Sequence, residues 1–298
     1  WATASIGVGE NNQIIGGYFN FDEAGNGLPG KPAMMTTDQS GCDKGYVGPA
    51  WEASNAFDNS DSPLSSNESC SYTSTFNGTS SAAPMVSGAV ALMLQSNAGL
   101  TWRDVKHILA NTAKKLDVNR GEKTYSGVVV DTGWITNAAG YNFHNTYGFG
   151  ALDTSAAVTM AENYDVTLGE MVKASATSVS VNQDGTPAST DISEETVTVL
   201  SQTRQDVGSV DAVRVSLSIS HEVPSELSIA LISPSGTRSV LLPVDSAYRD
   251  ITETFELSTN AFYREPAGGE WSLEIFDHDS TENQGTINSW GLTIYSSN

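Results

Sequence analysis

Residues 77–88 read Asn-Gly-Thr-Ser-Ser-Ala-Ala-Pro-Met-Val-Ser-Gly, and this stretch decides how the first half of the chain is expected to fold. A glycine-containing loop leads directly into Ala82–Gln95, a run of small and apolar residues. A helix that is apolar on all sides is expected to be buried. Pro84 suits the first turn of that helix. The stretch therefore predicts a loop that ends at the start of a core helix.

Ser80 stands where this helix is expected to begin. The first N–H groups of a helix have no intrahelical partner, and the helix dipole places partial positive charge there. A serine at this point can attack a carbonyl carbon while its own N–H stabilises the oxyanion that forms. A serine before an alanine-rich helix is more often only an N-cap. The serine-to-proline spacing alone would therefore not indicate catalysis.

The full string is more specific than a cap, because it resembles the catalytic-serine motif of the subtilisin-like serine proteases, Gly-Thr-Ser-Xaa-Ala-Xaa-Pro-Xaa-Val-Xaa-Gly. The positions that match are Gly78, Thr79, Ser80, Ala82, Pro84, Val86 and Gly88. The resemblance implies a serine endopeptidase that forms an acyl-enzyme on Ser80 and acts on protein or peptide substrates. It also implies that Gly78, Thr79 and Pro84 support the oxyanion site and the shape of the motif.

Two later segments resemble the kexin branch of the same family. Residues 100–105, Leu-Thr-Trp-Arg-Asp-Val, look like the start of the helix that follows the serine helix. Thr101 and Asp104 also have the spacing of a capping box. Residues 147–153, Tyr-Gly-Phe-Gly-Ala-Leu-Asp, look like the stretch that closes the catalytic domain, and a third helix is expected over Thr154–Asn163. These features predict the C-terminal part of an α/β catalytic domain over residues 1–169.

The second half has the alternation of β-strands. Apolar residues alternate over Val213–Ile219, Leu227–Leu231, Trp271–Ile275 and Trp290–Ile294, and Arg238–Leu242 is expected to pair as a hairpin. Several short strands with turns between them indicate a sandwich or barrel. Residues 231–237, 269–273 and 285–292 resemble the P domain, the jelly-roll module of kexins and furins. We therefore expect an all-β jelly-roll P domain over 170–298, with a connecting region over 174–194 near its start.

A serine nucleophile needs a base and an orienting acid. In this family the order along the chain is Asp, His, Ser, and an oxyanion asparagine lies between the last two. All four histidines follow Ser80, so none is in the expected place. We interpret His107 as surface or structural and His278 as part of a solvated acidic loop. The chain also opens without Met. We therefore expect a C-terminal piece, with the base, acid and asparagine supplied by an upstream segment in the same polypeptide or in a separate chain.

Three weaker features concern the remaining site residues. Cys42 and Cys70 are either a disulfide, as an extracellular compartment and the resemblance to kexins favour, or two free thiols. The resemblance makes Glu23 the nearest candidate for recognising a basic substrate side chain, although a plain surface carboxylate is the commoner explanation. The resemblance also implies structural calcium. Asp277, Asp279 and Glu282 are possible ligands, but no ligand set can be assigned.

Charge and hydropathy limit the partners. The chain has 298 residues with 35 acidic and 14 basic side chains, for a net charge of −21, so nucleic acid would be repelled. No apolar run approaches the ~20 residues of a membrane-spanning helix. We predict a secreted protease. Two alternatives remain open: a catalytically incompetent fragment or pseudoenzyme whose P domain serves stability, binding or attachment, and a purely structural β-sandwich module.

Overall fold

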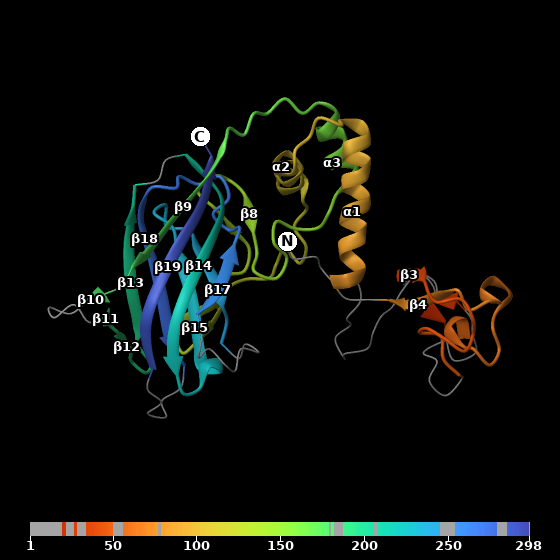
Figure 1. Cartoon of the computed structure of the whole chain (residues 1–298), viewed down its shortest axis with the longest axis horizontal. Helices are drawn as coiled ribbons and strands as arrows, with labels where there is room; N and C mark the ends of the chain where they lie inside the picture. The colour runs from red at the N-terminus through yellow and green to blue at the C-terminus, as the bar shows by residue number, and fades with distance from the viewer. Residues whose placement is uncertain are drawn as a thin grey trace. The chain divides into compact units, whose positions relative to one another are not determined.

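The computed structural model describes residues 20–21, 27–28, 34–49, 56–76, 79–178, 180–181, 187–205, 208–244, 254–278 and 285–297. Its internal contacts divide most of the chain into two units, Thr3–Ala98 and Gly99–Asn298. The elements of both are shown in Figure 1. This division rests on contacts within the structure and not on family membership. It therefore does not test the predicted domain boundary between residues 169 and 170, which stays a prediction.

The unit Thr3–Ala98 consists of short strands followed by one long helix. β1 (Asn20–Phe21) pairs with β2 (Gly27–Leu28), and β3 (Met34–Thr37) pairs with β4 (Tyr72–Phe76), both antiparallel. Two 3₁₀ turns, η1 (Ala56–Asp58) and η2 (Ser65–Asn67), lie in the connection between β3 and β4. The helix α1 covers Thr79–Ser96. It therefore begins three residues before the predicted start, Ala82.

The unit Gly99–Asn298 begins with two helices. α2 (Trp102–Thr112) has the predicted capping box: the Thr101 N–H donates to Asp104 Oδ2 at 2.8 Å, and the Asp104 N–H donates back to Thr101 Oγ1 at 3.3 Å. α3 (Thr154–Glu162) is capped by Asp153, whose carboxylate accepts from the Ala156 N–H at 3.0 Å. Between them lie two hairpins, β5–β6 (Lys123–Tyr125 and Val128–Asp131) and β7–β8 (Ile135–Thr136 and Asn142–Phe143).

Two antiparallel sheets form the rest of this unit (Figure 1). The first has the order β12-β19-β14-β17, and β9 also pairs with β19; these strands are Thr190–Ile192, Gly285–Ser297, Ser209–His221, Phe255–Thr259 and Met171–Ser178. The second has the order β13-β18-β15-β16, over Val197–Arg204, Gly269–Asp277, Leu227–Ile232 and Arg238–Leu242. A small hairpin, β10 (Ser180–Val181) with β11 (Pro187–Ala188), and the turn η3 (Pro224–Glu226) complete the described elements.

The core of the sandwich is built from the predicted alternating residues. β14 contributes Val213, Val215, Leu217 and Ile219, and the facing sheet contributes Leu227, Ile229 and Leu231 from β15 with Trp271, Leu273 and Ile275 from β18. All of these side chains are at most 1% exposed. Side chains from the inner faces of two packed sheets interdigitate in this way in a β-sandwich. The structure therefore confirms the all-β prediction for this half of the chain.

Irregularities in the β14–β19 pair bring further residues into the core. The register shifts between Val210 and Ala212 and again between Ser218 and Ile219. A bulge moves the residues beyond it to the opposite face of the sheet. Val210 and Ile287 are buried for this reason, although their parity differs from that of the other inward residues on their strands.

The region predicted as a connection over 174–194 is largely β-structure, so that prediction was wrong. β9 pairs with β19 over eight residues, and β12 pairs with the other end of β19. Small residues such as Ala174 and Ser175 lack the apolar alternation of a half-buried strand. β9 forms because it satisfies the backbone groups along one edge of β19.

A group of polar contacts, here called the polar joint, attaches helix α2 and the β7–β8 turn to the sandwich within this unit. Asp211 on β14 accepts a hydrogen bond from Arg103 Nη2 at 2.8 Å, and Lys106 Nζ donates to the Asp211 carbonyl at 2.6 Å and to Asn260 Oδ1 at 2.7 Å. Burial lowers the pKa of Lys106 to about 8, with Asp211 opposing and Arg103 adding to the shift. Helix α2 therefore contacts the sandwich through charged groups held in fixed directions.

Asn137, in the β7–β8 turn, makes the second part of this joint. Its Nδ2 donates to the carbonyls of Ala261 and Tyr263, both at 2.9 Å, while its Oδ1 accepts from the N–H groups of Ala139 and Tyr141 at 3.1 and 2.9 Å. The side chain is 3% exposed. One buried amide therefore uses all its bonding groups to join two stretches that are 124 to 126 residues apart in the chain.

We expect Asn137→Ala to lower the free energy of unfolding of this unit by about 3 kcal/mol, because it leaves buried donors and acceptors without partners. Urea unfolding followed by tryptophan fluorescence measures the change. Asn163→Ala is the matched control, because the exposed side chain of Asn163 makes one hydrogen bond, to the Thr159 carbonyl. We expect a change under about 1 kcal/mol there. Equal losses from both variants would contradict a special role for Asn137.

Candidate active site

Ser80 is the second residue of α1 and its side chain is exposed. It lies in the first turn, where backbone N–H groups have no intrahelical acceptor. Pro84 lies at the sixth helical residue rather than in the first turn. Because proline has no N–H, it cannot donate to the Ser80 carbonyl four residues earlier. Thr79 opens the helix, and Gly78 lies outside the described residues.

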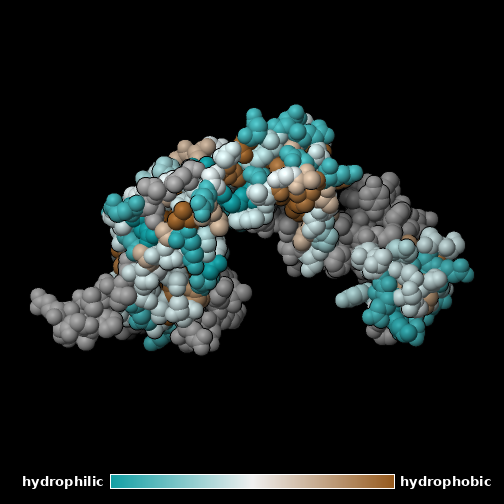
Figure 2. Space-filling model, turned by 45° about the horizontal axis from the view of Figure 1, so that its top comes forward, coloured by the Kyte–Doolittle hydropathy of each residue, from teal (hydrophilic) through white to brown (hydrophobic). Residues whose placement is uncertain are grey.

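The faces of α1 differ in exposure along its length. Ala82, Ala89 and Met93 are buried, whereas Met85, Leu92 and Leu94 are 44%, 48% and 39% exposed. Hydrophobic residues are accordingly visible at the surface of the helical part of the chain in Figure 2. A Cβ added to Gly88 would meet nothing within 4 Å, so this glycine does not provide close packing among the residues present.

The loop between β3 and β4 is held by one covalent bond and several polar side chains. Cys42 and Cys70, the pair considered in the sequence, form a disulfide with an S–S distance of 2.09 Å. Asn67, 4% exposed, donates to the Tyr72 carbonyl at 2.8 Å and accepts from the Tyr72 N–H at 3.1 Å. These contacts hold the chain in place just before β4, the strand that precedes α1.

Asp38 has a structural role in the same loop. Its carboxylate accepts from the N–H groups of Gln39, Tyr46 and Val47 at 2.8, 2.6 and 3.3 Å. Gly45 has φ +76°, and a Cβ there would lie 2.3 Å from Asp38 Oδ1, so only glycine fits. Glu23, the candidate for substrate recognition, lies outside the described residues.

Two of the four histidines are held by local contacts that suit a structural role. His107 packs among Tyr141, Tyr164 and Tyr263, and its Nδ1 lies 3.1 Å from Tyr263 Oη. His144 is fully buried, and its Nδ1 accepts from the Thr146 N–H at 2.9 Å. Burial lowers the pKa of both rings, and nearby arginines, Arg264 and Arg120 respectively, lower it further.

His221 forms a buried pair with Asp277. Its Nε2 lies 3.0 Å from Asp277 Oδ2, and its Nδ1 accepts from the Val223 N–H at 3.1 Å. Both side chains are inaccessible to solvent. A Cβ at Gly285 would come within 2.2 Å of the His221 ring. Because both ring nitrogens are engaged, this pair has the form of an acid–base relay but no free nitrogen to activate a nucleophile.

His278 corrects a prediction. The acidic run around it was expected to be a solvated loop, but Asp277 is 0% and His278 is 7% exposed, and His278 Nε2 lies 2.7 Å from Ser228 Oγ. The signal that was missed is the alternation of β18: Asp277 has the same parity as Trp271 and Ile275 and therefore faces inward.

A metal site is not apparent in the described ranges, where no group of three or more His, Cys, Asp or Glu side chains is placed to hold an ion. Asp277, one of the carboxylates considered for calcium, is engaged by His221, and Asp279 and Glu282 lie outside those ranges. The described residues therefore do not test the expected calcium, which stays a prediction. Separately, no helix in the described part of the chain has the length and hydropathy of a bilayer crossing.

Comparison with known families matches both halves of the chain. Residues 28–150 match the Subtilase family, and residues 210–294 match the Proprotein convertase P-domain. The chain is 34% identical over 269 residues to the Aeromonas extracellular serine protease of Aeromonas sobria, covering 83% of this chain and 42% of that protein. It is 32% identical over 227 residues to Furin-1 of Xenopus laevis, covering 75% and 27%. The chain thus spans less than half the length of either relative.

Solved structures give the same result. The crystal structure of the serine protease of Aeromonas sobria matches with a TM-score of 0.75 and 29% identity, over 89% of this chain and 51% of that one. The complex of that protease with its chaperone matches with a TM-score of 0.74 and 28% identity, over 90% and 51%. The predicted combination of a subtilase-like fold with a P domain is confirmed. Residues 151–209 lie between the two matched ranges.

Removing the disulfide by Cys42→Ser with Cys70→Ser should destabilise the unit Thr3–Ala98 by about 3 kcal/mol, since the bridge closes a loop of 28 residues. Limited proteolysis measures the change as faster cleavage between the two positions. Ser40→Ala is a control in the same loop, because it removes only the exposed hydrogen bond with Ser71. Cleavage of the double variant at the control rate would show that the loop does not depend on the bridge.

Acid should destabilise the unit Gly99–Asn298 through two of its histidines, the half-buried His107 and the buried His144. The folded state depresses the pKa of His107 and His144 below the ordinary value of about 6.5, so below that pH the unfolded state binds more protons. The stability is complete above about pH 6.5 and decreases as the pH is lowered. Urea midpoints at pH 7.5 and 5.5 measure the loss, which should be smaller in His107→Gln. An unchanged pH dependence in that variant would contradict the role of His107.

Proposed function

The chain combines a subtilase-family segment with a proprotein convertase P domain, and from this premise we propose that it is the nucleophile-bearing part of a serine endopeptidase. The observation that carries the proposal is Ser80, which is exposed in the first turn of α1 inside the complete serine motif. Its relatives among curated proteins are serine proteases and furins, which supports proteolysis as the activity.

In the proposed reaction Ser80 Oγ attacks the carbonyl carbon of a peptide bond and forms a tetrahedral intermediate. The Ser80 N–H, at the positive end of the α1 dipole, donates to the oxyanion. The hydroxyl proton passes to a base, which then gives it to the leaving amine. Water hydrolyses the acyl-enzyme in the second half of the reaction. Substrates are proteins or peptides, and a basic side chain recognised by Glu23 remains a proposal.

The base comes from a segment outside this chain in our proposal. The side chains of His144, His221 and His278 are buried and held by Thr146, Asp277 and Ser228. A subtilase histidine, its orienting aspartate and the oxyanion asparagine would therefore be supplied by the upstream segment. Without them the rate should fall by about 10⁴ or more, so this chain alone would be inactive.

The exposed side of α1 supports the same proposal. Met85, Leu92 and Leu94 are between 39% and 48% exposed, and Gly88 faces open space, on a helix with little polar surface. Such a helix is normally buried. We propose that the upstream subtilase segment covers α1 when it completes the active site, in the same polypeptide or as a separate chain. The relatives are more than twice as long as the region matched, which leaves room for that segment.

The P domain is proposed to stabilise the catalytic part. The joint made by Arg103, Lys106 and Asn137 attaches the end of the subtilase segment to the sandwich. An extracellular location is also proposed, because the disulfide requires an oxidising compartment and the Aeromonas sobria relative is named as extracellular. A chaperone partner would parallel the complex of that relative. Structural calcium stays a proposal, with no ligand set among the described residues.

The main alternative is a pseudoenzyme or fragment whose P domain acts in binding or attachment. A fluorophosphonate distinguishes the two, because it reacts with a serine activated by a base and not with an isolated serine. The protein would be labelled with the upstream segment present and with it absent. Labelling only in the presence of that segment supports the protease, and no labelling in either case supports the alternative.

Ser80→Ala should abolish labelling and lower kcat/KM by at least about 10⁴ in the complete protease. Ser87→Ala is the matched control, because Ser87 is exposed on the same helix and makes only a local hydrogen bond to the Ala83 carbonyl. We expect it to keep full labelling. If Ser80→Ala were labelled and active like Ser87→Ala, the nucleophile would be another residue.

A further inference from the structure

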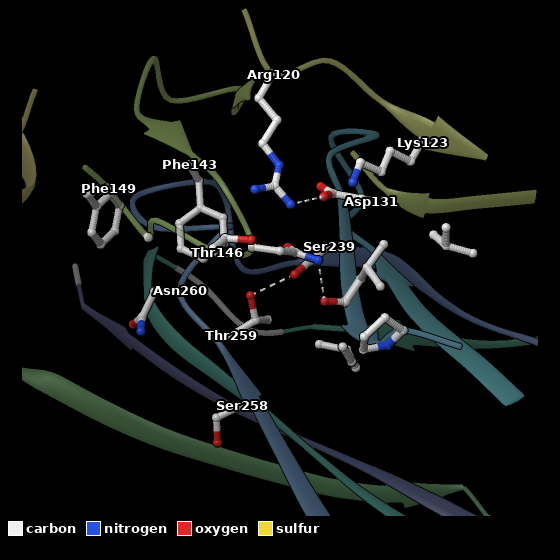
Figure 3. A pocket seen from close by; sticks show the side chains of 16 residues that line it. Arg120, Lys123, Asp131, Phe143, Thr146, Phe149, Ser239, Ser258, Thr259 and Asn260 are labelled. Atoms are coloured by element: carbon white, nitrogen blue, oxygen red, sulfur yellow. Dashed lines mark hydrogen bonds and ion pairs between the residues drawn. The ribbon is translucent and has the colours of Figure 1, made fainter. Parts of the chain in front are cut away.

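A cavity of about 660 Å³ lies inside the unit Gly99–Asn298, between the hairpins of the subtilase segment and strands β16 and β17 of the sandwich. Figure 3 shows Arg120, Lys123 and Asp131 at one side and Ser239 and Thr259 below them. Neither the serine motif nor the polar joint accounts for this cavity. Its volume suits a small ligand or the end of a peptide.

The charges around the cavity have the opposite sign to the protein as a whole. Arg120, Lys123 and Asp131 are the charged side chains among the described residues that line it, so the local sum is +1. The whole chain carries −21. A positive site of this kind attracts an anion where the rest of the surface repels it.

The acid in the cavity already has partners. Asp131 Oδ1 accepts from the Gly133 N–H at 3.0 Å, and Asp131 Oδ2 accepts from Arg120 Nη2 at 3.3 Å. His144 Nε2 lies a further 4.0 Å from the same carboxylate. These contacts hold Asp131 in place and leave the cations with unused donors.

The two cations can bind more than Asp131. A guanidinium has five N–H donors, and Arg120 makes one ion pair, to Asp131, among the described residues. Lys123 is exposed on β5, and no acidic group of the described residues lies within 4.0 Å of its ammonium. A further oxygen-bearing anion would therefore find donors without displacing an existing contact.

The remaining walls are neutral. Ser239 Oγ and Thr259 Oγ1 lie 2.8 Å apart, and Asn145 Nδ2 donates to the Val240 carbonyl at 2.9 Å. Phe143 and Leu241 add apolar surface beside the cations. The cavity therefore combines a cationic end with an apolar wall, as a ligand with a charged head and an apolar body requires.

We propose that this cavity binds a carboxylate carried on an apolar peptide residue, with the carboxylate between Arg120 and Lys123 and the apolar body against Phe143 and Leu241. A monoanion matches the local charge of +1, whereas a dianion would exceed it and meet the carboxylate of Asp131. Arginine binds carboxylates through paired N–H groups, which suits this choice. The carboxylate is either the C-terminus of that apolar residue or the side chain of an acidic residue next to it.

Calorimetry on the full chain tests the proposal with blocked amino acids. N-acetyl-L-leucine carries a terminal carboxylate and an apolar body, and N-acetyl-L-leucinamide has the same body without the charge. We expect the acid to bind and the amide to bind at least about tenfold more weakly. N-acetyl-aspartyl-leucinamide, which has only a side-chain carboxylate, then separates the two sources: tighter binding of either ligand identifies its class.

Two variants with opposite expected effects on binding complete the test. Lys123→Gln should weaken binding of N-acetyl-L-leucine about tenfold, and Asp131→Asn should strengthen it several-fold by removing a competing negative charge. Lys173→Gln, an exposed lysine on β9, is the matched control and should change nothing. Urea midpoints confirm that each variant is folded.

Three outcomes would overturn the proposal. These are equal binding of acid and amide, no binding of any of the three ligands up to about 10 mM, and a Lys123→Gln effect no larger than that of Lys173→Gln. Because the readout is binding and not proteolysis, each outcome is independent of whether Ser80 is a nucleophile.

Discussion

A buried carboxylate that needs a charge partner attaches helix α2 to the sandwich. Asp211 on β14 is 3% exposed, and Arg103 of α2 supplies the opposite charge at 2.8 Å. Separating the two would leave this buried charge with only its longer ion pair, to Arg264 at 3.9 Å, which is destabilising inside a protein. Lys106 and Asn137 then bind backbone carbonyls of the sandwich. Since hydrogen bonds weaken steeply with misalignment, this joint also defines the register in which the two parts meet.

The strands that form the sandwich could be predicted because burial on one face imposes a strict alternation, as in Val213–Ile219. The bulges near Val210 and Ile287 could not, because a register shift depends on the partner strand rather than on local sequence. β9 was missed for a related reason: its small residues carry no apolar pattern, and its pairing satisfies β19. Asp277 was predicted to lie in a solvated loop because it is charged, although its place in the alternation of β18 makes it face inward.

The candidate site, too, could be predicted only in part from the sequence. The serine motif around Ser80 could be recognised from the sequence, because each of its matching positions has its own physical requirement. The groups that would activate Ser80 could only be inferred to lie elsewhere. The structure adds that the histidines present have other partners, such as Asp277 and Ser228. It also adds the exposed apolar side of α1. In the proposed assembly one set of contacts would therefore both bury this helix and complete its chemistry.

The position of β19 has a consequence for biosynthesis. This last described strand lies in the interior of its sheet, between β14 on one side and β9 and β12 on the other. It also brings Trp290, Leu292 and Ile294 into the core. During translation the earlier strands leave the ribosome first, yet their sheet lacks its central member until residue 297 has emerged. The sandwich must therefore close after synthesis of this strand, and its unpaired edges stay available to holding factors until then.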